Sequence, residues 1–348
     1  MEQTGVEAIL ITHIPNVFYL SGFSGDAGAL LVEMNRATLL TDSRFTVQAS
    51  EELAPALIGL KIVKGSLASA AGAELVRRHV RGRAAFEGAR VSVLDAADLR
   101  KASQDRVRWR PVTGWVERLR TVKEAGEVER IRDAARLASE VIVEVLPLVK
   151  PGVKECDLAA EIEFRMRRRG ASAPAFETIV ASGARGALPH ARATTKVFRA
   201  NELVVIDMGA ILRHYCSDLT RTVFLGRAPT RIRRWYRAVS EAQEAAAEAL
   251  RPGAPAEAAD LAARQVLRGY GLERAFVHST GHGLGLEVHE GPRLGRGQSQ
   301  PLDASSVVTI EPGVYMEGAG GIRLEDDLLV LPGGPEVLTN APREFLEL

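Results

Sequence analysis

The first third of the chain alternates short apolar runs with longer amphipathic stretches. Runs such as AILIT, GALLVE, ATLLT, LKIVKG and RAAFEG have the length and composition of strands. Residues 66–80 and 93–102 have the spacing of helices instead. Strands that alternate with helices predict an α/β domain here. Within it, NVFYLSGFSG, which begins at Asn16, is interpreted as a turn that leads into a strand.

A long amphipathic helix is predicted from Glu124 to Val149, where apolar residues recur at spacings of three and four. Pro147 is expected to kink or end its last turn, and Pro151 stops it. A chain of 348 residues is expected to form about two domains. We place the boundary just before this helix, which gives domains of residues 1–120 and 121–348.

The order of predicted elements then repeats. A helix over residues 156–169 is followed by the strand-like runs ETIVAS and LVVIDMG. Helices over 230–250 and 256–270 are followed by SVVTIEPG and DLLVL. Helices followed by strands, twice over, predict an internal duplication that packs two α+β halves around a shared sheet.

Composition limits the partners and the compartment. The formal charge of +1, from 45 basic and 44 acidic residues, predicts neither a nucleic acid nor a membrane partner. No apolar run reaches the roughly 18 residues of a membrane helix, and the N-terminus lacks the pattern of a signal peptide. The two cysteines, Cys156 and Cys216, fit reduced thiols. A cytoplasmic protein is therefore expected.

Three of the seven histidines lie in one glycine-rich stretch, FVHSTGHGLGLEVHE, from Phe276 to Glu290. These are His278, His282 and His289, and the glycines between them would let the backbone pass close to a ligand or an ion. The stretch alone leaves two interpretations open. One is a metal or ligand site, and the other is a set of imidazoles satisfied by neighbouring backbone groups.

Two aspartates interrupt apolar runs in LVVIDMGAILRHYCSDLTRTVFL. If this segment is a hairpin that turns near Leu212 and Arg213, Asp207 and Asp218 lie directly opposite each other. Two carboxylates so placed repel each other unless a cation or a proton lies between them. Exposed hairpin acids are the alternative interpretation.

Two glutamates occupy similar apolar runs, Glu311 in VVTIEPGVY and Glu325 in GIRLEDD. With the aspartates and His282 they provide four carboxylates and one imidazole, which suit Mn²⁺, Co²⁺, Fe²⁺ or Zn²⁺. Because carboxylates can bridge, five ligands suffice for two ions about 3.5 Å apart. Such a pair suits hydrolysis of a carbonyl compound.

The motifs VVIDMGA, YCSDLTRT, STGHGLGLEVHE, TIEPGVY and GIRLEDD resemble the dinuclear site of the Xaa-Pro peptidases, the prolidases and aminopeptidases P. The resemblance implies a pita-bread catalytic domain, preceded through NVFYLSGFSG and TDSRF by a creatinase-type N-terminal domain. It implies that Asp207 holds one ion, that Asp218 and Glu325 bridge both, and that His282 and Glu311 complete the second. Glu311 would also accept the proton of the bridging water and pass it to the leaving nitrogen.

The resemblance also assigns roles around the ions. His190, in SGARGALPHA, matches the histidine that hydrogen-bonds near the scissile carbonyl, and His289 matches the one that stabilises the tetrahedral intermediate. His278 matches a histidine that lines the proline subsite. Arg323 matches an arginine that orients a ligating aspartate, and is grouped with His278 on the substrate side of the site.

A dipeptide carries its free carboxylate on the proline, so a prolidase should present a cation to it. Arg44 follows the predicted helix cap, Asp42 or Ser43, where a cation gains nothing from the helix dipole. We therefore predict that Arg44 binds this carboxylate. The next residue is Phe45, where the family pattern has a tyrosine.

The sequence thus predicts a prolidase with two divalent ions, Mn²⁺ first among them, which acts on Xaa-Pro dipeptides. The resemblance implies a homodimer, through the N-terminal domains. Aminopeptidase P, which acts on longer Xaa-Pro peptides, is the nearest alternative. A methionine aminopeptidase usually lacks such an N-terminal domain, and creatinase lacks the metal ligands. A non-catalytic peptide-binding relative would normally have lost ligands.

Overall fold

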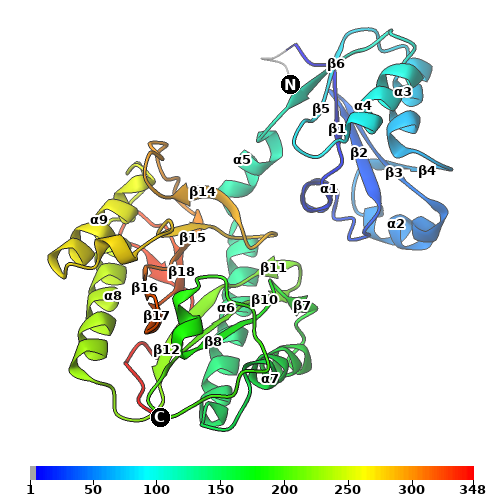
Figure 1. The fold of residues 1–348 in the computed structure, drawn as a ribbon. Helices are drawn as coiled ribbons and strands as arrows, with labels where there is room; N and C mark the ends of the chain where they lie inside the picture. The colour runs from blue at the N-terminus through cyan, green and yellow to red at the C-terminus, as the bar shows by residue number, and fades with distance from the viewer. Residues whose placement is uncertain (1–4) are drawn as a thin grey trace. The chain divides into compact units, whose positions relative to one another are not determined.

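The computed structural model describes residues 5–348, and the chain divides into two compact units, residues 1–119 and 120–348 (Figure 1). The N-terminal unit is built on a six-stranded sheet in the order β4-β3-β2-β1-β5-β6, in which only β2 is antiparallel to its neighbours. Its strands are β1 (Ala8–Ile11), β2 (Gly28–Glu33), β3 (Arg36–Thr41), β4 (Ile58–Ile62), β5 (Arg83–Glu87) and β6 (Arg108–Val112). Its helices are α1 (Ile14–Ser21), α2 (Thr46–Leu53), α3 (Leu67–Arg77), α4 (Val93–Ala102) and α5 (Trp115–Thr121), and α5 leads into the second unit.

The predicted helices of this unit are confirmed, and side-chain caps explain where they begin. The Ser66 hydroxyl accepts a hydrogen bond from the backbone N–H of Ser69 at the start of α3, and Ser92 does the same for Asp95 in α4. Asp42 caps a short 3₁₀ turn, η2 (Ser43–Phe45), that precedes α2. Strands and helices therefore alternate as expected for an α/β domain.

The segment from Asn16 was predicted wrongly. It is part of helix α1, and not a turn into a strand. A proline lies in the first turn, and Gly22 ends the helix with φ of 76° while its N–H donates to the carbonyl of Phe18. The glycine that suggested a turn is the C-terminal cap of the helix. The Asn16 amide donates to Glu87 at 2.6 Å and to Glu117 at 2.9 Å, which holds α1 in place.

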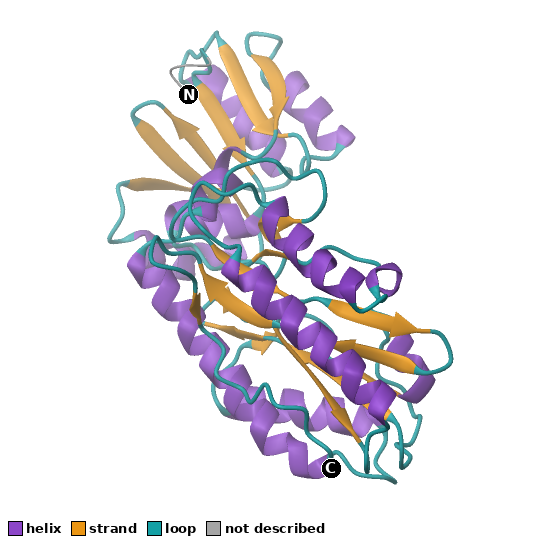
Figure 2. Ribbon diagram, turned by 90° about the vertical axis from the view of Figure 1, so that its left-hand side faces the viewer, coloured by secondary structure: helices purple, strands orange, loops and turns teal. Residues whose placement is uncertain are grey.

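The second unit consists of two halves with the same order of elements (Figures 1 and 2). The first half contains α6 (Ala125–Val145), α7 (Glu155–Arg168), β7 (Ala173–Pro174), β8 (Ile179–Ser182), β9 (Leu203–Met208), β10 (Ala210–Leu212), β11 (Tyr215–Cys216) and β12 (Leu219–Phe224). The second contains α8 (Thr230–Glu248), α9 (Glu257–Gly269), β13 (Gly281–Gly283), β14 (Glu290–Leu294), β15 (Val307–Ile310), β16 (Gly313–Met316), β17 (Gly320–Arg323), β18 (Asp326–Leu329) and β19 (Glu336–Val337).

Each half packs its helices on its own strands. One buried cluster joins α6 and α7 to β8, β9 and β12, and another joins α8 and α9 to β15, β16, β17 and β18. The strands form two main sheets, β12-β9-β8 and β14-β13-β15-β18-β19, with the helices outside them (Figure 2). Among the described residues, no helix combines the length and the apolar character needed to traverse a lipid bilayer.

The hairpin that carries the two aspartates has a different register from the predicted one. Asp207 pairs with Thr220, and not with Asp218. The turn lies at Arg213 and His214, with φ of 48° and 72°, about one residue beyond the predicted position. Turns of this kind are normally marked by Asn-Gly, which this sequence lacks. A slip of two residues leaves each side chain on its face, so both aspartates still face one side.

Candidate metal centre

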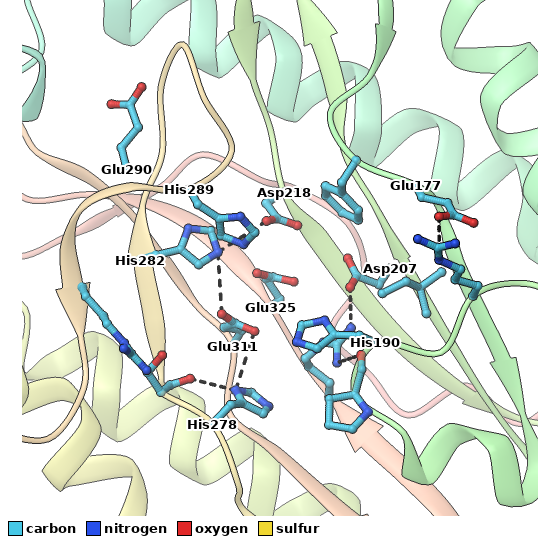
Figure 3. A pocket seen from close by; sticks show the side chains of 17 residues that line it. Glu177, His190, Asp207, Asp218, His278, His282, His289, Glu290, Glu311 and Glu325 are labelled. Atoms are coloured by element: carbon cyan, nitrogen blue, oxygen red, sulfur yellow. Dashed lines mark hydrogen bonds and ion pairs between the residues drawn. The ribbon is translucent and has the colours of Figure 1, made fainter. Parts of the chain in front are cut away.

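A cavity of about 570 Å³ in the second unit brings together the predicted site residues (Figure 3). Its lining includes His190, Asp207, Asp218, His278, His282, His289, Glu311, Arg323 and Glu325. Arg44 is the one predicted residue outside it. That side chain lies in the N-terminal unit, is 69% exposed, and pairs with Asp42 through hydrogen bonds of 2.8 and 3.0 Å.

Both halves supply the proposed ligands. Asp207 lies in β9 and Asp218 lies directly before β12, both in the first half. His282 is in β13, Glu311 follows β15, and Glu325 lies between β17 and β18, all in the second half. The chemistry of the cavity therefore depends on how the two halves pack.

The imidazole of His282 is oriented for a cation. Its Nδ1 lies 3.0 Å from the carbonyl of Gly283, so Nδ1 carries the proton and donates. The lone pair of Nε2 then faces Asp218 Oδ2 and Glu311 Oε1, each 3.7 Å away. These distances are too long for hydrogen bonds. Ligand atoms of Asp218, His282 and Glu325 all lie within 4.8 Å of one another, close enough to hold a metal ion, and within residues 5–348 Asp207 and Glu311 do not join this group.

The carboxylates show the same need for a cation. Asp207 Oδ1 and Asp218 Oδ1 are buried, and no hydrogen-bond partner for either is found within residues 5–348. Burial, together with Glu325 and Asp207, raises the pKa of Asp218 well above its usual range. Burial and the nearby Glu311 do the same to the pKa of Glu325, and burial raises the pKa of Glu311 to about 8. Four acids crowded in this way fit divalent cations.

Arg323 is a buried cation that holds one of these acids. Its Nη2 contacts Asp207 Oδ2, and its Nε donates to the Thr220 hydroxyl at 3.1 Å. That hydroxyl in turn donates to Glu325 Oε2 at 2.6 Å. Arg323 therefore positions ligand side chains, and it is only 3% exposed in the cavity wall.

Tyr315, which the sequence analysis did not single out, connects Arg323 to His278. Arg323 Nη1 donates to the Tyr315 hydroxyl at 2.9 Å, and this hydroxyl lies 2.8 Å from His278 Nε2. His278 Nδ1 lies 2.8 Å from the carbonyl of Ser279, so Nδ1 donates and Nε2 accepts from the tyrosine. Burial lowers the pKa of His278 to about 4, which keeps this imidazole neutral. The only signal in the sequence was a tyrosine four residues after Glu311.

His190 and His289 flank the ligands. The His289 ring lies edge-on to that of His282, with 4.4 Å between centroids. Burial and the nearby His190 lower the pKa of His289, which favours a neutral imidazole that can donate one hydrogen bond. The segment that carries His289 is anchored by Glu290, which binds Arg120 and lies 3.5 Å from Lys123 Nζ.

The glycines between the histidines have a different purpose from the one predicted. A Cβ on Gly281 would lie 1.9 Å from the carbonyl oxygen of Thr309, and one on Gly283 would lie 2.1 Å from that of Gly291. The close approach is therefore between β13 and its neighbouring strands, and not to a ligand. Glycine lets β13 fit between β14 and β15 and so brings His282 to the cavity.

Comparisons with known proteins cover both units. Residues 129–332 match metallopeptidase family M24, and residues 1–122 match the creatinase/prolidase N-terminal domain. The chain is 35% identical to an Xaa-Pro dipeptidase of Pyrococcus furiosus, over 99% of this chain and 97% of that protein.

Two solved structures are similar over the whole chain. An Xaa-Pro dipeptidase from Bacillus anthracis has a TM-score of 0.95 and 34% identity, over 100% of this chain and 96% of that one. An X-Pro aminopeptidase from Thermotoga maritima has a TM-score of 0.91 and 36% identity, over 100% and 97%. The chain is thus similar both to proteins named Xaa-Pro dipeptidase and to one named X-Pro aminopeptidase.

Proposed function

This chain belongs to metallopeptidase family M24 and is a peptidase, and from this premise we propose that it hydrolyses Xaa-Pro bonds, preferably in dipeptides. The observation that carries the proposal is the convergence of four carboxylates and one imidazole on one cavity that also contains neutral histidines. Such a site suits an imide bond, because proline offers no N–H for an ordinary peptidase to bind.

The family uses divalent ions, and the donor set fits two of them, with Mn²⁺ our first choice. Asp207, Asp218, His282, Glu311 and Glu325 would hold them. The chemistry that bound ions supply is polarisation of the scissile carbonyl and activation of a water. Two buried carboxylate oxygens that find no hydrogen-bond partner in the described part of the chain, Asp207 Oδ1 and Asp218 Oδ1, support this assignment.

The side chains of the chain itself move the protons. Glu311 would accept a proton from the attacking water and return it to the proline nitrogen as the bond breaks. His289 and His190 would donate hydrogen bonds to the oxygen of the carbon that becomes tetrahedral. His278, kept neutral by burial and oriented by its hydrogen bonds with Tyr315 and Ser279, would form the wall against which the proline ring packs.

The preference for dipeptides requires a cation for the free carboxylate of the proline. Arg293 lines the cavity and is exposed, and no ion pair of its guanidinium is found within residues 5–348. We propose Arg293 for this role, alongside the predicted Arg44. Support for Arg44 is weaker because Asp42 already pairs with it.

One assay series tests the function. Protein stripped of metal is supplied with Mn²⁺, Co²⁺ or Zn²⁺ and given Ala-Pro, Leu-Pro and matching Xaa-Pro-Yaa tripeptides. We expect hydrolysis only with metal, and a higher kcat/KM for the dipeptides. A higher kcat/KM for the tripeptides would favour an aminopeptidase P, and no hydrolysis of either series with any metal would refute the proposal.

The cation is tested by removing it. Arg293→Ala should raise KM for Leu-Pro by about tenfold or more, because a charge-assisted hydrogen bond contributes about 1.5–3 kcal/mol. It should leave KM for a tripeptide amide, which has no free carboxylate, nearly unchanged. Arg44→Ala is measured in the same assays. If replacing an arginine raises KM equally for Leu-Pro and for the tripeptide amide, that arginine does not bind the free carboxylate.

Assembly and location are proposals of the same kind. We propose a homodimer, and exposed apolar side chains of the N-terminal unit, namely Val47, Leu57, Val93 and Leu94, support a partner surface there. Light scattering on the purified protein tests it. A cytoplasmic location rests on the two free cysteines, Cys156 and Cys216.

A further inference from the structure

A single buried carboxylate in the first half of the second unit holds both ends of the segment that carries His190. Glu155 Oε1 accepts from the backbone N–H of Ser182 at 2.9 Å and from its hydroxyl at 2.8 Å. Oε2 accepts from the N–H of Thr194 at 3.1 Å and from its hydroxyl at 2.8 Å. Ser182 begins the segment, Thr194 ends it, and Glu155 is fully buried between them.

An arginine completes this arrangement. Arg185 Nε donates to Glu155 Oε2 at 3.0 Å, and its Nη2 donates to the carbonyl of Arg192 at 2.5 Å. Arg192 lies two residues after His190. The carboxylate and the arginine together bind the backbone on both sides of the histidine.

The second half contains the same arrangement around His278. Asp260 Oδ1 accepts from the backbone N–H of Thr280 at 3.1 Å and from its hydroxyl at 3.0 Å. Arg264 Nε donates to Asp260 Oδ2 at 2.6 Å, and its Nη2 donates to the carbonyl of His278 itself at 2.7 Å. The guanidinium also lies 4.3 Å from the ring centroid of Phe276. Asp260 and Thr280 are fully buried.

The two arrangements share a common core, although Thr194 has no counterpart around Asp260. In each, one carboxylate oxygen accepts hydrogen bonds from the backbone N–H and the hydroxyl of a Ser or Thr that precedes a glycine. The other carboxylate oxygen accepts a hydrogen bond from an arginine Nε. Each acid lies in the first turn of the second helix of its half, α7 or α9. We call them the Glu155 clamp (Glu155, Ser182, Arg185, Thr194) and the Asp260 clamp (Asp260, Arg264, Thr280).

Hydrogen bonds keep the carboxylate of Glu155 ionised. Burial raises the pKa of Glu155, but the bonds from Ser182 and Thr194 outweigh burial and the pKa is lowered overall. A charged acceptor forms stronger hydrogen bonds than a neutral one, so the segment is held firmly. The backbone N–H of Cys156 also donates to Thr194, and the carboxylate adds the connection to the other end.

We propose that the Glu155 clamp and the Asp260 clamp are matched positioning devices, one for each of two cavity histidines, His190 and His278. The inference rests on the proposed function, in which these imidazoles contact substrate. Neither acid lines the cavity, so each acts through the segment it holds.

Four double-mutant cycles, which combine each acid variant with each histidine variant, test it. Glu155→Gln and Asp260→Asn place an amide N–H₂ against donors, and each should lower kcat/KM by about tenfold, since small misplacements of a reacting group are costly. Glu155→Gln should act mainly on kcat, through His190, and Asp260→Asn mainly on KM, through the proline wall. The loss of kcat/KM caused by Glu155→Gln should shrink below about twofold in the His190→Ala background and persist in the His278→Ala background. For Asp260→Asn the two backgrounds should exchange roles.

Milder variants and a matched control guard against simple unfolding. Ser182→Ala and Thr280→Val remove one hydroxyl each, and should give smaller losses with the same pattern. Glu74→Gln removes a fully paired acid of similar burial from the N-terminal unit, where it binds Arg77, Arg78 and Lys61. It should lower the unfolding temperature without changing kcat or KM.

A spectroscopic measurement on the metal-free protein needs no activity. The chain has seven histidines, and the imidazole NMR signals of His190 and His278 are assigned from their alanine variants. Glu155→Gln should shift or broaden the His190 signal and leave that of His278 unchanged, and Asp260→Asn should do the reverse.

The outcomes separate two claims, that His190 and His278 contact the substrate and that the clamps position them. If His190→Ala and His278→Ala hydrolyse Leu-Pro as the wild type does, the proposed catalytic roles of these histidines are wrong, and the clamps then position no residue that contacts the substrate. If those variants are impaired but Glu155→Gln and Asp260→Asn lower activity equally in every background, the clamps are general stabilisers and our inference is wrong.

Discussion

Glu311 shows how one residue can be set for proton transfer by its surroundings. Burial raises its pKa to about 8 in the metal-free cavity, although Arg323 opposes the shift. A bound divalent ion would lower that pKa again. Metal binding near neutral pH should therefore release protons, and the apparent metal affinity should rise with pH.

The stability of the metal-free protein should fall as pH rises from 6.5 to 8.5. Between its ordinary value of 4.5 and about 8, Glu311 binds more protons in the folded than in the unfolded chain, so raising the pH favours unfolding. The histidines act oppositely, because pKa values of about 4 for His278 and His282 add stability as pH rises, but only up to their ordinary 6.5. Melting temperatures in EDTA measure the effect, and Glu311→Gln should flatten it. A melting temperature that rises across this range would contradict the assignment.

Tyr315→Phe should weaken the site without unfolding the protein. The hydroxyl joins Arg323 to His278, and its loss leaves a buried guanidinium N–H and an imidazole nitrogen without a partner. We expect a stability loss of about 1–2 kcal/mol and a fall in kcat/KM of about tenfold. Kinetics and chemical denaturation of the same preparation measure both. Unchanged kcat/KM would show that His278 needs no such support.

At the residue scale, the sequence indicated side chains with distinctive chemistry and missed those that support them. The acids of the cavity stood out because they interrupted apolar runs, and three of its histidines stood out because they were crowded between glycines. Tyr315, Glu155 and Asp260 gave no such signal, since a tyrosine in a strand and an acid in a helical first turn are common for local reasons. The partners that join them to the histidine segments, Ser182, Thr280 and His278, lie 20 or more residues away, and only the fold brings them together.

At the scale of elements, strand β13 can pack between its neighbours only because Gly281 and Gly283 have no side chains. Gly281→Ala would place a methyl group 1.9 Å from the Thr309 carbonyl, so β13 must move away from its neighbour and carry His282 with it. We expect a loss of about 2 kcal/mol or more and weaker metal binding, measured by denaturation and by metal titration.

Gly126→Ala is the control for that substitution. Gly126 lies exposed in the first turn of α6, and apart from its chain neighbours and the backbone of its own helix no atom of residues 5–348 would lie within 4 Å of its Cβ. It should gain up to about 1 kcal/mol, because alanine favours a helix more than glycine does. Equal effects of the two substitutions would show that close strand packing is not what Gly281 provides.

Elements were predictable where the pattern was long and regular. The helix over 230–250 corresponds closely to α8, because many turns repeat one apolar face. The helix over 93–102 matches α4, which is shorter and buries only Ala96 and Leu99, but whose start is fixed by the Ser92 cap. The short helix α1 was missed because its glycine cap resembles a turn, and the aspartate hairpin was misregistered because Arg213 and His214 occupy left-handed conformations without the usual sequence signal. Short features depend on tertiary packing more than on local pattern.

At the scale of the whole molecule, the predicted family and the pita-bread architecture are confirmed. Each unit also has its own buried clusters, within residues 6–116 and 128–341. All proposed metal ligands belong to the second unit.

Calorimetry should therefore distinguish the units. Because a ligand stabilises only the unit that binds it, Mn²⁺ should raise the unfolding transition of residues 120–348 and leave that of the N-terminal unit in place. A difference of several degrees is expected with excess ion, since mass action adds about 2.7 kcal/mol at a hundredfold excess over Kd. A single transition that moves as a whole would show that the units unfold together.

The division of ligands between the two halves has one more consequence. Asp207 and Asp218 precede the loop at Gly226, while His282, Glu311 and Glu325 follow it. If the polypeptide were cut at that loop, neither fragment would retain a complete donor set. Reassociation of the fragments would then become dependent on divalent cations, which would act as a reversible cross-link between two separately synthesised pieces.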